Sequence, residues 1–331
     1  MRTLNAKVTL GLIALSLIVL AIFHEVSDFA NGTSGPQVQV SIPNGASGVS
    51  IGDILQAEKV IKSSKYFVDF YKNNRDAQAI APGIHKVQTH LSTKMAVTEL
   101  LDQNRISNAI TVKEGSTFSD VLQSLKSNSA VDVTNIKEAT FQIPLANRLK
   151  SLEGQLYPAI YSFESGTSAQ KAIQIMLDKF SQVSNGGELK PFGRFSKYEV
   201  LTIASMIQVE GDAQDFPKVA RVIYNRLDAK MPLQLNSTVQ YAAGLRGRIA
   251  LSKASTNIAS PYNTYRNLGL PPTPISNPSS AAISAAQNPT KGDWLYFITV
   301  KPGDTRFTKS FTEFENWNTL YNNNLANGLF K

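Results

Sequence analysis

Glu210 is the residue of this chain best placed to act as an acid or a base. It ends one apolar-periodic segment and directly precedes a polar break at residues 211–215. Helical spacing relates the apolar residues on both sides of the break: Val200, Leu201, Ala204 and Ile207 before it, and Val219, Ala220, Ile223 and Leu227 after it. Pro217 suits the first turn of the second helix. The spacing therefore predicts two helices, with Glu210 projecting from the end of the first.

A carboxyl group between two largely apolar helices can have a raised pKa and serve as a general acid. The alternative is an ordinary solvated glutamate at a helix end, because most glutamates in proteins are exposed.

Neutral hydrogen-bonding groups and aromatic rings are abundant in residues 225–265. Sugars present hydroxyl groups at their edges and C–H groups on their faces, so this mixture predicts a carbohydrate-binding cleft on a long loop. The side chains expected to contribute are Asn225, Gln234, Asn236, Thr238, Tyr241, Tyr262, Asn263, Thr264 and Tyr265. An ordinary polar loop is the alternative.

Composition excludes several other kinds of site. The 331 residues contain no cysteine, which rules out disulfides, a thiol nucleophile and cysteine-based zinc sites. The three histidines, His24, His85 and His90, all lie far upstream of Glu210. No phosphate-binding loop, metal-ligand cluster or nucleophile elbow is present, so we expect no metal and no cofactor. The net charge of +8 suits an anionic partner, but no aromatic-basic motif points to nucleic acid.

The N-terminus carries an apolar run at residues 8–23. Arg2 and Lys7 precede the run, and no Lys or Arg follows it before Lys59, which places the N-terminus in the cytoplasm and the rest outside. The run is slightly short for a span, and a cleaved signal peptide is the competing interpretation. We expect an uncleaved anchor, because no convincing small-x-small cleavage site follows.

The remaining elements predict an α+β fold with an N-terminal transmembrane helix, a small α/β subdomain and a mixed α/β domain that has a helical core around Glu210. A strand, a glycine turn and an amphipathic helix occur twice, at residues 38–55 and 110–125. This arrangement suggests a duplicated unit, although similar local connections also arise without duplication. Further predicted elements are a strand at 160–163, a helix at 169–180, a helix at 279–287, a buried strand at 294–300 and a helix at 311–325.

Several motifs together resemble the MltG/YceG-like endolytic murein transglycosylases. They occur in a consistent order within residues 38–325: EGQLYPAIYSF, ASMIQVEG, VARVIYNRL, LQLNSTVQYA, SPYNTY, GLPPTPI and WLYF. The resemblance implies a cytoplasmic tail (1–7), a membrane anchor (8–24), a linker (25–37), a LysM-like subdomain (38–109) and a catalytic domain (110–331). It also implies cleavage of peptidoglycan glycan strands outside the cell membrane.

By motif position, Glu210 corresponds to the catalytic glutamate of the family. The family pattern often has a second acid two residues earlier, where this chain has Gln208, so Glu210 is the only carboxylate in the motif. Other departures concern substrate contacts more than the reaction: Asn236 and Ala159 in place of Asp, Thr273 in place of Gly, and Phe314 in place of a frequent His.

The implied reaction needs a single carboxylate. Glu210 would protonate the oxygen between N-acetylmuramic acid and N-acetylglucosamine and then deprotonate the muramyl C6 hydroxyl, leaving a 1,6-anhydro end and terminating strand elongation. Glu153 is a candidate auxiliary carboxylate or substrate contact, with a structural role as the alternative.

Two other functions stay open. One is a membrane-tethered, non-catalytic peptidoglycan-binding scaffold for cell-wall synthases, the penicillin-binding proteins. The other is a two-carboxylate muramidase that uses Glu210 with Glu153 or Asp212.

Overall fold

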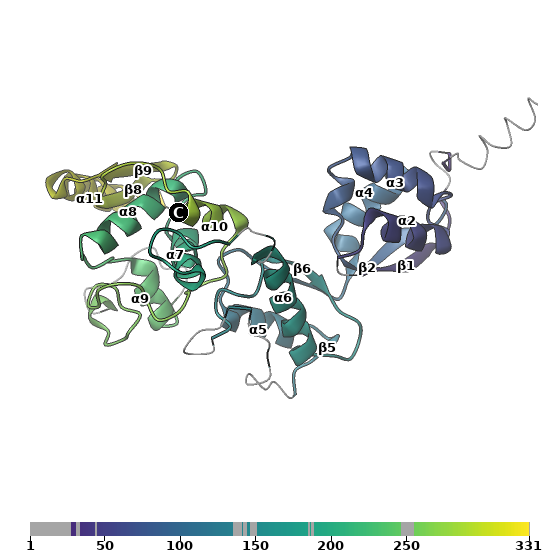
Figure 1. Ribbon diagram of the computed structural model, residues 1–331, viewed down its shortest axis with the longest axis horizontal. Helices are drawn as coiled ribbons and strands as arrows, with labels where there is room; N and C mark the ends of the chain where they lie inside the picture. The colour runs from purple at the N-terminus through teal and green to yellow at the C-terminus, as the bar shows by residue number, and fades with distance from the viewer. Residues whose placement is uncertain are drawn as a thin grey trace, which may run out of the picture. The chain divides into compact units, whose positions relative to one another are not determined.

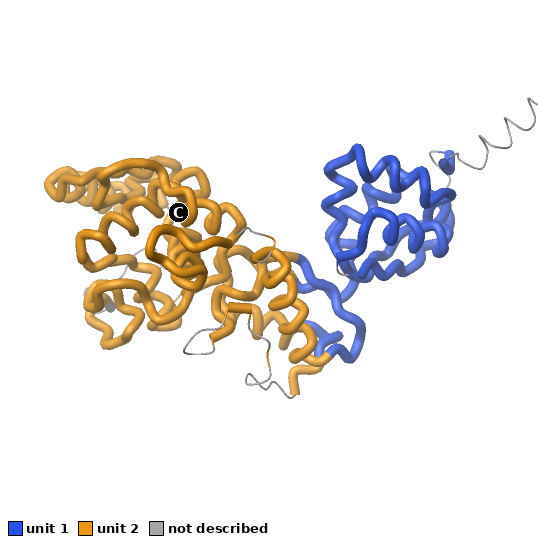
Figure 2. Tube along the Cα trace, in the orientation of Figure 1, with its two compact units in different colours: residues 1–110, 128–131, 160–167 blue, residues 111–127, 132–159, 168–331 orange. Residues whose placement is uncertain are grey.

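The computed structural model describes residues 28–30, 34–43, 45–134, 141, 144–145, 151–184, 186, 189–245 and 255–330. The chain divides into two compact units (Figure 2). Unit 1 comprises residues 1–110, 128–131 and 160–167, and unit 2 comprises residues 111–127, 132–159 and 168–331. The predicted anchor at residues 8–24 lies outside the described residues. Within the described part, no helix combines the length and apolar character needed to cross a membrane.

Unit 1 is built on a three-stranded antiparallel sheet in the order β1-β2-β3. Its strands are β1 (Gln37–Ile42), β2 (Gly83–Gln88) and β3 (Ile106–Ser107). Its helices are α2 (Gly48–Ala57), α3 (Ser64–Asn73) and α4 (Thr93–Leu101). The strands and helices enclose a separate apolar core that includes Val40, Leu55 and Phe67. Unit 1 therefore has its own hydrophobic core, as an independently packed subdomain requires.

Both predicted strand–glycine–helix segments form. The first runs from β1 through Gly45 to α2, and the second from β4 (Ala109–Val112) through Gly115 to α5 (Phe118–Lys126). The two glycines have φ values of 74° and 77°, a left-handed conformation that side chains disfavour. The helices fall in different compact units, so the two segments do not make one shared subdomain.

Short strands occur where the chain passes between the units. β4 pairs with β6 (Ala159–Ser162), and β5 (Val131–Asp132) pairs with β7 (Thr167–Ser168). The predicted strand and helix at this point are confirmed, because β6 is followed by the 15-residue α6 (Ala169–Val183).

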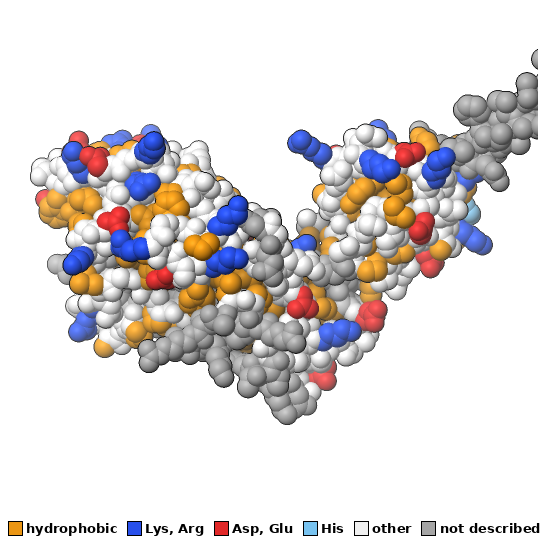
Figure 3. Space-filling view, viewed as in Figure 1, with side chains coloured by type: hydrophobic (Ala, Val, Ile, Leu, Met, Phe, Trp, Pro, Cys, Tyr) orange, Lys and Arg blue, Asp and Glu red, His pale blue; other side chains and the backbone are white. Residues whose placement is uncertain are grey.

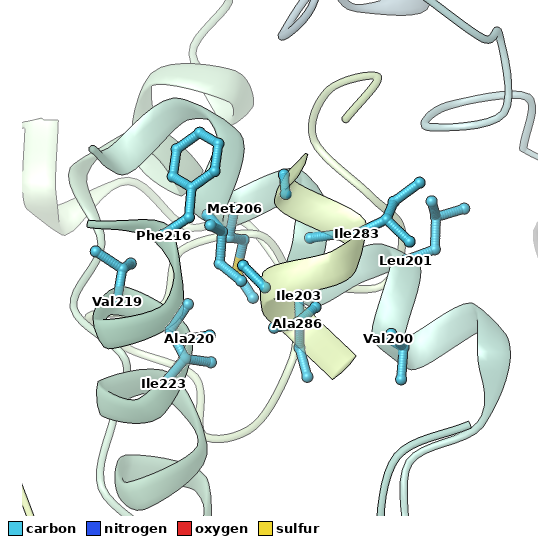
Figure 4. Close-up of a cluster of buried hydrophobic side chains, with 14 of the residues drawn as sticks. Val200, Leu201, Ile203, Met206, Phe216, Val219, Ala220, Ile223, Ile283 and Ala286 are labelled. Carbon is cyan, nitrogen blue, oxygen red and sulfur yellow. The ribbon is translucent and has the colours of Figure 1, made fainter. Parts of the chain in front are cut away.

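The core of unit 2 is helical, as predicted. Its central helices are α7 (Lys197–Glu210), α8 (Phe216–Asp228) and α10 (Ser280–Gln287), which pack against one another (Figure 1). Figure 4 shows their apolar side chains meeting, among them Ile203, Met206, Ala220 and Ile283. All four are at most 1% exposed, so this part of the unit is a close-packed interior.

A polar network fixes the connecting segments of unit 2 onto this core. Ser205 Oγ, buried on α7, accepts a hydrogen bond from the Ile275 N–H at 3.0 Å. Asn277 accepts from the Leu156 N–H at 3.0 Å and donates to the Ser116 carbonyl at 2.9 Å. Gly154 has φ +81°, and a Cβ there would lie 2.5 Å from Pro274, so the turn at 153–158 requires glycine.

The last layer of unit 2 is a hairpin with a helix. It consists of β8 (Tyr296–Lys301), β9 (Asp304–Thr308) and α11 (Phe311–Ala326), and α11 packs on β8 (Figure 1). The prediction that the strand at 294–300 is buried is only partly correct. Of the residues in β8, Val300 is buried, and Tyr296–Thr299 are half-buried because they face a cavity.

The mixed α/β fold is confirmed, since helices and small sheets occur in both units. On the face shown in Figure 3, Lys and Arg side chains are scattered among other residues on both units and do not gather into one patch. The net positive charge thus has the form of an ordinary solvated surface on that face.

Candidate active site

Glu210 is the last residue of α7, as the sequence predicts. The helix begins at a capping box, in which Ser196 and Glu199 satisfy each other's backbone N–H groups, and ends at Gly211. Val200 to Ile207 are all buried. Because the helix is held along this whole stretch, the position of Glu210 is fixed by the core of unit 2.

The carboxyl group of Glu210 contacts the first turn of α9 (Asn236–Ala242). The Ser237 N–H donates to Glu210 Oε1 at 3.1 Å. The Ser237 side-chain hydroxyl is buried beside it and has no hydrogen-bond partner among the described residues. Burial raises the pKa of the Glu210 carboxyl above its ordinary value, while the interactions with Ser237 act in the opposite direction. The net result is a carboxyl group that retains its proton to a higher pH than an exposed glutamate.

A cavity of about 580 Å³ opens next to Glu210. Its volume falls within the range of roughly 300–1,000 Å³ that is usual for ligand sites. Among the described residues that line it, Glu210 is the only acidic one. The other lining residues are Arg226, Leu233, Gln234, Leu235, Asn236, Tyr265, Tyr296, Phe297, Ile298, Thr299, Phe311, Phe314, Asn318, Tyr321 and Phe330. The cavity therefore places one proton donor among amide and aromatic groups.

Three of the predicted binding residues line this cavity: Gln234, Asn236 and Tyr265. The Tyr265 hydroxyl donates to Asn236 Oδ1 at 2.6 Å. Burial, and to a lesser extent the charge of Glu210, raise the pKa of Tyr265, so its hydroxyl stays protonated. The hydrogen-bonded side chains of Asn236 and Tyr265 thus present fixed dipoles in the same cavity as Glu210.

The other predicted binding residues are not among those that line the cavity, and they make hydrogen bonds within the protein. Thr238 and Asn263 are fully buried. Asn263 donates to the carbonyls of Thr256 and Ile258, and Thr238 donates to the Leu235 carbonyl. Asn225 donates to the carbonyls of Gly292 and Trp294, and the Tyr262 hydroxyl is bonded to Thr273 Oγ1. These residues shape the segments that reach the cavity.

Glu153 is buried and is not among the described residues that line the cavity. Its two carboxylate oxygens accept from the Phe118 N–H and from the Tyr241 hydroxyl, each at 3.0 Å. These contacts join Glu153 to the start of α5 and to Tyr241 of α9. Asp212 is exposed in the turn after α7 and does not line the cavity either.

Arg226 is the most heavily bonded side chain in the cavity wall. Its guanidinium donates to the carbonyls of Leu295, Pro232 and Leu233 at 2.6–3.0 Å and to Gln234 Oε1 at 3.1 Å. It also lies over the Tyr296 ring, 5.0 Å from the centroid. With its Nε and Nη1 groups donating to protein acceptors in this way, the buried guanidinium acts as a clamp that joins the segment before α9 to the start of β8.

Comparison with known proteins identifies the family. A model of the YceG-like family matches residues 40–319. The chain belongs to the YceG-like family.

Named relatives and a solved structure agree with this assignment. The endolytic murein transglycosylase of Bacillus subtilis (strain 168) is 33% identical over 303 residues, which is 83% of this chain and 82% of that protein. The endolytic murein transglycosylase of Streptococcus pneumoniae serotype 2 is 32% identical over 81% of this chain, but only 55% of that longer protein is covered. A crystal structure of a putative yceG-like protein from Listeria monocytogenes aligns with a TM-score of 0.53 at 27% identity, covering 85% of this chain and 98% of that one.

The departures from the YceG-like pattern have identifiable surroundings. Gln208 Oε1 accepts from the Ser279 N–H at 2.8 Å, so it serves the start of α10. Thr273 is buried and bonded to Tyr262. Phe314 lines the cavity on α11, and Ala159 begins β6.

Sequence reasoning did not identify two groups of cavity residues in this YceG-like protein. Arg226 lies three residues after Ile223 and seven after Val219, on the apolar stripe of α8, and an arginine there is a signal of a buried role. Phe311, Phe314, Asn318 and Tyr321 follow the spacing of one helix face, which was readable in the sequence but not linked to Glu210.

Proposed function

We propose that this YceG-like protein is an endolytic peptidoglycan lytic transglycosylase with Glu210 as its catalytic acid and base. The observation that carries the proposal is a cavity in which Glu210 is the single acidic lining residue among those that the structure describes, with a pKa raised by burial. The names of the relatives, endolytic murein transglycosylases, support the same reaction and make peptidoglycan the substrate.

In the first step, protonated Glu210 donates its proton to the glycosidic oxygen between N-acetylmuramic acid and N-acetylglucosamine. The raised pKa favours this protonated form. As the bond between C1 and this oxygen breaks, positive charge develops on the muramyl ring. The dipoles of Asn236 and Tyr265, preorganised by their mutual hydrogen bond, are placed to stabilise it.

In the second step, carboxylate Glu210 removes the proton from the C6 hydroxyl of the same muramyl residue. The C6 oxygen attacks C1, which closes a 1,6-anhydro ring and returns the proton to Glu210. Because the nucleophile is part of the substrate, no entropy is lost in recruiting water, and no second carboxylate is required.

The test is mass spectrometry of uncrosslinked glycan strands incubated with wild-type protein and with Glu210→Gln. The amide can still accept from the Ser237 N–H, so the variant should fold, while formation of anhydromuramyl ends should fall by about 10² to 10⁴. Glu153→Gln is the matched control and should still produce anhydro ends. Anhydro ends formed by Glu210→Gln at the wild-type rate would reject the assignment.

Two other outcomes identify the alternatives. Reducing ends in place of anhydro ends would point to a two-carboxylate muramidase, and their loss in Glu153→Gln would make Glu153, not Asp212, the second carboxylate. Glycan binding without any cleavage by the wild-type protein would point to a scaffold.

The location and organisation of the protein are further parts of the proposal. We propose that residues 8–24 anchor it in the cell membrane with the N-terminus in the cytoplasm, and that residues 38–109 form a LysM-like subdomain. The apolar run with its flanking charges supports the anchor, and the separate core of unit 1 supports a subdomain. Cell-wall synthases are the expected partners. Release of the full-length protein from membranes by salt alone would contradict the anchor.

A further inference from the structure

The cavity face of α11 is aromatic along its length. Phe311, Phe314, Asn318 and Tyr321 are spaced by three, four and three residues, so they lie on one side of the helix, and all four line the cavity. Tyr296 faces them from β8. Its ring centroid is 5.3 Å from that of Phe314 in a stacked arrangement and 5.6 Å from that of Phe311. We call Tyr296, Phe311 and Phe314 the aromatic wall.

The aromatic wall is not used to fill a core. α11 has 16 residues and none of them is buried. Phe311 is 54% exposed, an unusual position for so large an apolar ring. The helix is attached to β8 by the ring contacts with Tyr296 and by Asn324, which donates to the Val300 carbonyl at 2.7 Å. The three rings therefore line the cavity without being buried in a core, and Phe311 is the most exposed of them.

The chemistry of the cavity defines what can cover these rings. Charge is scarce among the described residues that line it, because Glu210 is the only acidic one and Arg226 the only basic one, and the Nε and Nη1 groups of Arg226 donate to protein acceptors. Asn318 supplies an amide within the aromatic row, and Asn236 and Gln234 supply amides on the side of the acid. A ligand with flat C–H faces and hydroxyl or acetamido edges satisfies both sides, and a pyranose ring has this form.

We propose that the aromatic wall is a glycan subsite, on which an N-acetylhexosamine ring of the strand stacks while Glu210 acts on a bond beside it. The occupant is a sugar because the wall and the acid line one continuous cavity; this step rests on the proposed function. The wall then positions the strand through apolar contact, and the acid performs the proton transfers.

The test measures binding separately from cleavage. Full-length Glu210→Gln, which should not cut, is titrated calorimetrically with uncrosslinked glycan strands. Phe311→Ala and Phe314→Leu are added to this background, and the second keeps apolar volume while removing the ring. Leu320→Ala is the matched control, since Leu320 is an exposed apolar residue on the same helix that does not line the cavity. Each wall variant should raise Kd about threefold to tenfold, and the control should not.

Each other result overturns the subsite. Unchanged Kd in both wall variants would mean that the rings do not touch the strand. An equal loss of glycan affinity in Leu320→Ala would mean that displacement of α11, and not the loss of ring stacking, weakens binding. Absence of glycan binding by the Glu210→Gln protein itself would also reject the subsite. In that case, anhydro ends formed by the wild-type protein would still support the lyase activity. Conversely, weakened binding in the wall variants with no cleavage by wild-type protein would keep the subsite and reject the lyase.

Discussion

Two helices, α7 and α11, contribute residues to the same cavity but differ in how deeply they are buried in the protein. In α7, which carries Glu210, every residue from Val200 to Ile207 is buried. In α11, which carries the aromatic wall, no residue is buried. One side of the site is part of a close-packed core, and the other is a helix laid on a hairpin at the edge of unit 2 (Figure 1).

The difference suits the two tasks. Proton transfer requires the acid to be held close to its target in a defined geometry, and a close-packed helix provides that precision. Contact with a sugar face tolerates small shifts, because stacking is not strongly directional, and a helix with few buried contacts can adjust to it. The comparison predicts that the two helices respond differently to the same kind of substitution.

The largest difference in stability between the two helices is expected when one apolar side chain of each is truncated to alanine. Ile203→Ala on α7 removes a fully buried side chain and should lower the free energy of unfolding by about 2–5 kcal/mol. Leu320→Ala on α11 removes a side chain that is 36% exposed and should change it by no more than about 0.5 kcal/mol. Urea denaturation of both variants measures the difference. Similar losses in the two would show that α11 is as tightly integrated as α7.

The sequence alone predicts α7 with Glu210 at its end, but it predicts much less of the aromatic side of the cavity that α11 forms. Periodicity around Glu210 located α7 and α8, because a buried helix face repeats its apolar residues at regular intervals. The final helix was also located, but the contact of Phe311 and Phe314 with the cavity of Glu210 joins residues about 100 positions apart. Local pattern carries no information about such a pairing.

Polar residues were harder to assign than apolar ones. Asn236 and Asn263 have the same side chain and lie in the same amide-rich region, yet one lines the cavity and the other is fully buried and bonded to two carbonyls. An amide serves equally well for binding a ligand or for holding a loop. Which role it has depends on where the backbone carbonyls lie, and this is a property of the fold.

Arg226 connects the two sides, so replacing it tests whether they are mechanically coupled. Arg226→Lys keeps the charge but cannot reproduce the planar set of bonds to Leu295, Pro232 and Leu233. We expect a loss of about 1.5–3 kcal/mol in unfolding free energy, together with a lower kcat as the segment before α9 shifts. Thermal denaturation and product assays measure the two effects. Loss of stability with an unchanged kcat would show that the clamp does not position the acid.

The smallest and sharpest test concerns the proton on Glu210. Its pKa is raised by burial, so the protonated acid persists as pH increases and the rate of the first step should fall only when pH passes that raised value. The Ser237 N–H favours the carboxylate, and therefore its removal should raise the pKa further.

Ser237→Pro deletes this donor in the first turn of α9, where the lost N–H breaks no hydrogen bond within the helix, whereas Ser237→Ala keeps it. The high-pH limb of the kcat profile should move to higher pH in the proline variant and by less in the alanine variant. An identical limb in all three proteins would mean that a different group, such as Tyr265 in the same cavity, controls the profile. A shift to lower pH in the proline variant would mean that the Ser237 N–H stabilises the protonated acid, which would reverse the role assigned to it.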